Sequence, residues 1–144
     1  MALSPLAVHE AATSLLECAC QALTDLNTEI PGLDGCPCRS CVVPGTPAAD
    51  GCDGTCAQLP AGQFPGQLTV NVARLYTSER SSFPREIQVV RDSKPCITAQ
   101  ITVVELAVTL FRCMPGMTNE GCPPSCEELS ASAMQLHADM LAIQ

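Results

Sequence analysis

Aromatic residues are almost missing from this chain of 144 residues, which has no tryptophan, one tyrosine and three phenylalanines. Its hydrophobic core must therefore be built from leucine, valine, isoleucine and alanine. A chain of this length can bury such a core without help from a metal ion or a disulfide. We therefore expect a single domain that spans residues 1–144.

Basic residues are missing from both ends of the chain, since no lysine or arginine occurs in residues 1–38 or 113–144. The net charge of −8 argues against binding of nucleic acid, which requires clustered lysine and arginine. The acidic ends and the mildly basic middle are complementary in sign, which favours head-to-tail contact between copies of the chain. Two solvated acidic helix faces would give the same distribution.

Long apolar segments are also missing. The longest apolar stretch, residues 101–111, contains Glu105 and is too short to span a bilayer. The first charged residue is Glu10, so the N-terminus has no basic region of a signal peptide. We therefore expect no membrane contact and synthesis in a cytosol, where thiols stay reduced unless the product later leaves the cell.

The sequence contains no motif of a known catalytic site, neither a phosphate-binding glycine loop nor a His-Glu-x-x-His or Gly-x-Ser-x-Gly segment. The two histidines, His9 and His137, are expected on the outer faces of two terminal helices. Neither histidine is paired by a motif with a particular cysteine nucleophile. We therefore expect that the protein is not an enzyme and has no cofactor.

Both ends of the chain predict helices. Residues 4–27 carry one apolar stripe, with Ser4 as a cap and Pro5 in the first helical position. Ser125 and Glu128 form a capping box that opens a second helix. That helix carries a stripe consisting of Leu129, Ala133, Leu136 and Met140.

The middle of the chain predicts strands. Alternating apolar residues indicate a strand over 67–77 and a short strand over 87–91. Residues 97–113 indicate a long strand or a strand with a bulge near Glu105. Residues 28–66 read as a long Cys-, Gly- and Pro-rich loop at the surface, with a short strand around 41–43. The fold class is therefore α+β, a small antiparallel sheet of three to four strands flanked by the two helices.

Cysteine is abundant, with eleven residues. Five of them, in the long loop, are candidate disulfide or zinc thiols: Cys36, Cys38, Cys41, Cys52 and Cys56. Only Cys38 and Cys41 have the Cys-x-x-Cys spacing of a zinc ribbon, so disulfides and buried apolar thiols remain open alternatives. Cys18 and Cys20 cannot share one helix face and should have different surroundings.

Several segments of the sequence, taken together, resemble those of a known protein family. They are residues 38–45, 66–76, 82–84, 104–108 with Arg112 and Cys113, 123–125 and 138–140. In this combination the chain resembles the small Cys-rich head-to-tail connector or tail terminator proteins of long-tailed phages of actinobacteria. The resemblance covers nearly the whole chain, and its motifs are structural ones.

The resemblance implies a structural virion protein of the phage neck, assembled in the host cytoplasm. A tail terminator would form a homo-oligomeric ring of six subunits that caps the tail tube and contacts the tail tube protein and the neck proteins. A stopper, an adaptor or a zinc-stabilised protein-binding module are the alternatives. Arg74, Arg85 and Arg112 are the candidates for a charge-complementary contact between subunits.

Overall fold

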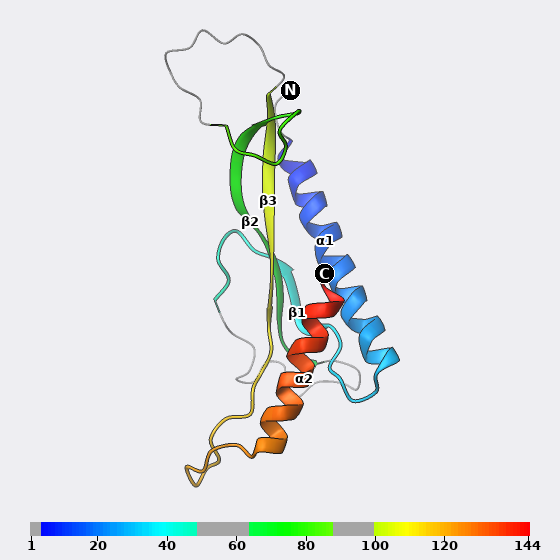
Figure 1. The fold of residues 1–144 in the computed structure, drawn as a ribbon, viewed down its shortest axis with the longest axis vertical. Coiled ribbons are helices and arrows are strands. Elements are labelled where there is room, and N and C mark those ends of the chain that lie inside the picture. The colour runs from blue at the N-terminus through cyan, green and yellow to red at the C-terminus, as the bar shows by residue number, and fades with distance from the viewer. Residues whose placement is uncertain (1–3, 49–63, 88–99) are drawn as a thin grey trace.

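A computed structural model describes residues 4–48, 64–87 and 100–144. Its elements follow in the order α1, β1, β2, β3 and α2. The two helices flank a three-stranded mixed sheet, so the expected α+β class is confirmed. The molecule is elongated, with β2, β3 and α1 running along its long axis and α2 at one end (Figure 1).

The N-terminal helix α1 spans Pro5–Glu29 and has Pro5 in its first turn. Ser4 occupies the cap position with an extended backbone, but its side chain makes no capping hydrogen bond. The buried side chains of α1 are Ala12, Leu16, Ala19 and Leu23. Their spacing places them on one face of the helix, which packs on Leu68 and Val70 of the sheet.

The sheet has the strand order β1-β2-β3, with β1 at Pro37–Val42, β2 at Phe64–Glu79 and β3 at Gln100–Phe111. The ladder between β2 and β3 is antiparallel and is interrupted once, between Val72 and Arg74. This bulge lies opposite Glu105, as expected, but the extra residue belongs to β2. Gly66 has a positive φ of 111°, and a side chain there would collide with the carbonyl of Phe111.

One strand pairing differs from the expectation. β1 pairs with β2 in parallel, so the sheet is mixed and not wholly antiparallel. Parallel neighbours need a crossover of a dozen residues or more, and residues 43–63 between the two strands are enough for one. The expected strand over 87–91 lies largely outside the described residues, but Glu86 forms a bridge to Ser78.

The C-terminal helix α2 spans Cys126–Ala142 and lies beside α1 (Figure 1). Its predicted capping box is present: the Ser125 hydroxyl accepts from the Glu128 amide, and the Glu128 carboxylate accepts from the Ser125 amide. The Ser125 amide and the Ser125 hydroxyl both donate to the Glu128 carboxylate, and these two bonds lower the pKa of Glu128 because they stabilise its charged form. The helix therefore begins at the predicted residue.

Candidate assembly surface

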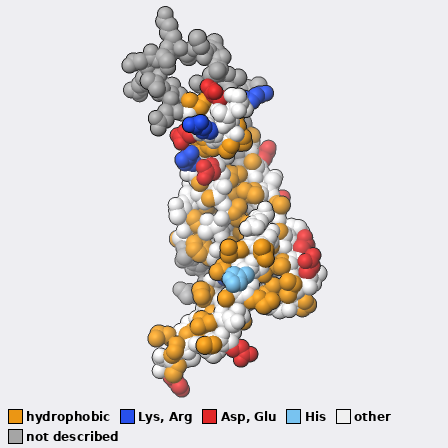
Figure 2. Space-filling model, in the orientation of Figure 1, with side chains coloured by type: hydrophobic (Ala, Val, Ile, Leu, Met, Phe, Trp, Pro, Cys, Tyr) orange, Lys and Arg blue, Asp and Glu red, His pale blue; other side chains and the backbone are white. Residues whose placement is uncertain are grey.

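Helix α2 packs on the rest of the chain with a side that lies next to the apolar stripe, and not with the stripe itself as its sequence suggests. Its one buried residue is Asp139, and the half-buried residues around it are small or polar, such as Ser132, Gln135 and Ala138. The large apolar side chains lie toward solvent: Leu136 is 49% exposed and Met140 is 59% exposed. In Figure 2 this end of the molecule presents a largely hydrophobic surface around a single visible histidine.

The exposed side chains form a regular seam. Leu129, Ala133, Leu136 and Met140 follow one another at intervals of four, three and four residues, and Ile143, which caps the helix and is half-buried against the core, continues the spacing. This is the spacing with which a helix packs against another element along a coiled-coil seam. We call the four exposed residues, Leu129, Ala133, Leu136 and Met140, the α2 seam. Beside it lies an apolar hollow of about 280 Å³, whose wall includes Leu110 of the adjacent strand.

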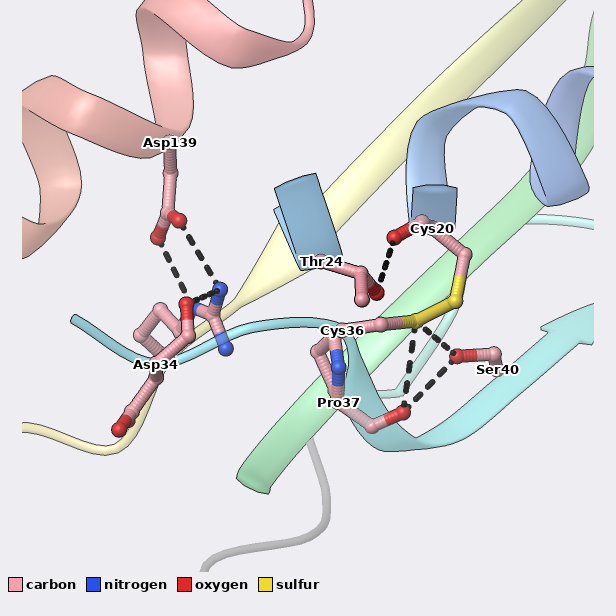
Figure 3. The surroundings of a disulfide bond; sticks show 8 residues. Cys20, Thr24, Asp34, Cys36, Pro37, Ser40 and Asp139 are labelled. Carbon is pink, nitrogen blue, oxygen red and sulfur yellow. Dashed lines mark hydrogen bonds and ion pairs between the residues drawn. A yellow bond between two sulfur atoms is a disulfide. The ribbon is translucent and has the colours of Figure 1, made fainter. Parts of the chain in front are cut away.

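A polar clasp holds α2 to the body of the molecule. The Arg112 guanidinium donates to both carboxylate oxygens of Asp139, from Nε at 2.8 Å and from Nη2 at 2.9 Å. Arg112 Nη2 also donates to the Asp34 carbonyl, and Gln135 of α2 donates to the same carbonyl and to Asp139. Asp139 points from α2 toward Asp34 in Figure 3. Two buried charges are therefore neutralised by each other within one chain.

Arg112 was expected at the surface as an interface residue, but the clasp buries it. Its side chain is 7% exposed and that of Asp139 is 2% exposed, so Arg112 cannot present its charge to a neighbouring subunit. Its Nη1 atom is buried and has no hydrogen-bond partner among the described residues. This pair could not be predicted from the sequence, because its members lie 27 residues apart and Arg112 is outside the helix that carries Asp139.

The other two candidate arginines lie at the opposite end of the molecule from α2. Arg74 of β2 is exposed, bonds to Glu86 and Glu105 at 3.1 and 3.6 Å, and stacks over the Tyr76 ring. Arg85 is exposed in the turn that follows β2. The arginine side chains visible in Figure 2 gather at this end. Arg74 and Arg85 therefore remain candidates for a contact between subunits.

The cysteines have several different states. Cys20 of α1 and Cys36, just before β1, form a disulfide (Figure 3). Cys38 and Cys113 each belong to a further disulfide. The free thiols of the described residues are Cys18, Cys41, Cys122 and Cys126. The different surroundings expected for Cys18 and Cys20 are confirmed, since the first is an exposed thiol and the second a disulfide half.

These states bear on the zinc hypothesis. Cys36 and Cys38 lack the free thiolates that zinc needs, because each is oxidised. Cys41 keeps its thiol, and Cys52 and Cys56 lie outside the described residues. Within 4–48, 64–87 and 100–144, no three His, Cys, Asp or Glu side chains come together as metal ligands. The disulfide interpretation therefore holds for Cys36 and Cys38.

The remaining predicted positions are simple to place. His9 and His137 both lie on exposed faces of their helices, as expected. None of the helices in the described ranges combines the length and the apolar character that a membrane crossing requires. No protein-family model, curated protein or solved structure matches the chain.

Proposed function

We propose that this protein is a structural subunit that acts by assembling into a closed homo-oligomeric ring, and that it does so without catalysis. The observation that carries the proposal is the exposed α2 seam. Burying a leucine or methionine side chain completely contributes about 1.5–3 kcal/mol. Covering half-exposed Leu136 and Met140 would thus contribute roughly 1 kcal/mol each, and Leu129 would add to this.

The sheet supports the same proposal. β1 and β3 are its outer strands, and β3 offers twelve residues whose outer edge has no partner strand among the described residues. Its only charged residue is Glu105, so little opposes pairing with another chain. A subunit in a ring can satisfy such an edge with its neighbour, whereas an isolated monomer exposes it to uncontrolled association.

The more specific role rests on the family resemblance. We propose that the ring is the tail terminator of a phage neck, most simply of six subunits, stacked between the tail tube protein and the head connector. The acidic surface is suited to a ring through which DNA passes, since it would not hold the phosphate backbone. The location would be the virion, after assembly in the host cytoplasm.

Native mass spectrometry and negative-stain electron microscopy of the full-length chain test the ring. We expect one closed species of fixed subunit number, with a visible central channel, at micromolar concentration and low salt. A monomer over the whole concentration range, or an open filament, would contradict the proposal. Antibody labelling of phage particles would test the neck location separately, and label on the capsid or tail tip would exclude it.

A further inference from the structure

A second surface of this chain has the composition of an interface and lies far from the α2 seam. The turn after β2 exposes Arg80, Phe83 and Arg85, and the Phe83 side chain is 60% exposed. We call these three residues the hairpin tip. Phe83 is one of only four aromatic residues in the chain. Its exposure therefore cannot be explained by an abundance of aromatic residues. Aromatic residues and arginine are enriched in interfaces and supply most of their hot spots.

The hairpin tip is a folded turn. The Ser82 amide donates to the Glu79 carbonyl at 3.1 Å, and the Arg85 amide donates to the Ser82 carbonyl at 2.8 Å. The buried Ser78 hydroxyl donates to the Arg85 carbonyl at 2.7 Å. These bonds fix both ends of the segment that carries Phe83. A side chain held out by a fixed backbone loses little conformational entropy when it binds.

The charges of the two ends favour contact between copies. Arg80 and Arg85 form no ion pair with a described residue, whereas Arg74 nearby is engaged by Glu86 and Glu105. The C-terminal segment 113–144 contains Glu120, Glu127 and Glu128 on its surface and no basic residue at all. Acidic side chains of the α2 region can therefore meet arginines at the hairpin tip of a second copy.

We infer that the hairpin tip of one subunit docks on the α2 seam of the next, with Phe83 in the apolar hollow lined by Leu110, Leu136 and Met140. Arg80 and Arg85 then face the acidic first turn of α2. The inference rests on the proposed self-assembly and names the two surfaces that make it. The contact joins different surfaces of two copies, so it repeats from subunit to subunit and closes when the rotation permits.

Photo-cross-linking tests the contact directly. A benzophenone amino acid replaces Phe83 in the full-length chain, and a mixture of ¹⁵N-labelled and unlabelled protein is irradiated. After reduction, trypsin releases residues 81–85 and residues 113–144 as single peptides, because the second contains no lysine or arginine. We expect these two peptides to be joined, with one labelled and one unlabelled partner. A cross-link to the segment that contains Leu110, which lines the same hollow, would also support the inference, and a cross-link from position 83 to any other segment would overturn it.

Charge reversal supplies an independent measure. Arg80→Glu with Arg85→Glu should weaken self-association about tenfold, and adding Glu127→Lys to the same chain should restore part of it. Glu10→Lys, on the exposed face of α1, is the matched control and should have no effect. If the double variant associates normally, the proposed contact is wrong, although the proposed ring is not affected. If the wild-type chain never associates, both the proposed contact and the proposed ring are wrong. If it forms a closed dimer joined through these surfaces, the contact is supported and the ring is wrong.

Discussion

Helices α1 and α2 carry similar apolar stripes and use them in opposite ways. α1 buries Ala12, Leu16, Ala19 and Leu23 against the sheet of its own chain. α2 is attached through the Arg112–Asp139 clasp and leaves Leu136 and Met140 half exposed. A stripe at helical spacing therefore indicates that a helix has an apolar partner, but it does not say whether that partner lies in the same chain.

The clasp gives the largest expected effect on stability. Arg112→Met leaves the Asp139 carboxylate buried without a counter-charge, which typically costs about 3–5 kcal/mol. We expect α2 to detach or the whole chain to lose that stability, as measured by urea unfolding followed by circular dichroism. The double variant Arg112→Met/Asp139→Leu should recover most of the loss. Equal instability of the single and double variants would show that the ion pair is not what holds α2.

Two leucine truncations measure how differently the two helices are packed. Leu23→Ala in α1 removes a fully buried side chain and should cost about 2–5 kcal/mol. Leu136→Ala in α2 should cost less than about 1 kcal/mol in the monomer, because its side chain is already half solvated. The two losses are compared by measuring the unfolding midpoints of both variants at protein concentrations below those at which the chain associates. Similar losses at the two positions would mean that α2 packs as tightly as α1.

The disulfide that joins α1 to the start of β1 is expected to stabilise the folded chain measurably. Cys20→Ser with Cys36→Ser opens a loop of 16 residues, for which the chain-entropy relation gives roughly 3 kcal/mol. Cys18→Ser, which removes an exposed free thiol, is the matched control and should unfold like the wild type. If the double variant also unfolds like the wild type, this bond does not stabilise the fold.

The smallest expected effect is the pH dependence of the capping box. Hydrogen bonds from Ser125 hold the pKa of Glu128 below its ordinary value of 4.5. The stabilisation is therefore complete above about pH 4.5 and is lost as the pH falls through the lowered pKa. We expect Glu128→Gln to remove this part of the acid dependence of α2 helicity, measured by circular dichroism between pH 2 and 6. An unchanged acid profile would contradict it.

Local features of the fold could be predicted from the sequence because they depend on neighbouring residues. Pro5 and the Ser125–Glu128 capping box locate the helix starts, and β-branched residues identify β3 as a strand. The parallel pairing of β1 could not be predicted, because it depends on the path of a long connection. The same holds for the pairing of Cys20 with Cys36, since eleven cysteines allow many combinations.

The candidate site was predicted only in part, for a related reason. Periodicity found Leu129, Leu136 and Met140, but exposure depends on which face of α2 meets the body of the chain. That face is chosen by Asp139 and Gln135, which bind Arg112 and the residue 34 backbone across long sequence separations. Arg112 was therefore expected at a surface that the clasp in fact buries.

We expect another subunit to cover the α2 seam, and sedimentation velocity can detect the loss of that contact. The variant Leu136→Gln/Met140→Gln keeps good helix formers in α2 while removing its apolar side chains. Leu6→Gln changes an exposed leucine of α1 that lies outside the seam and is the matched control. We expect the wild type and the control to sediment as the same closed oligomer and the seam variant to sediment as a folded monomer. An oligomer of unchanged mass for the seam variant would contradict it.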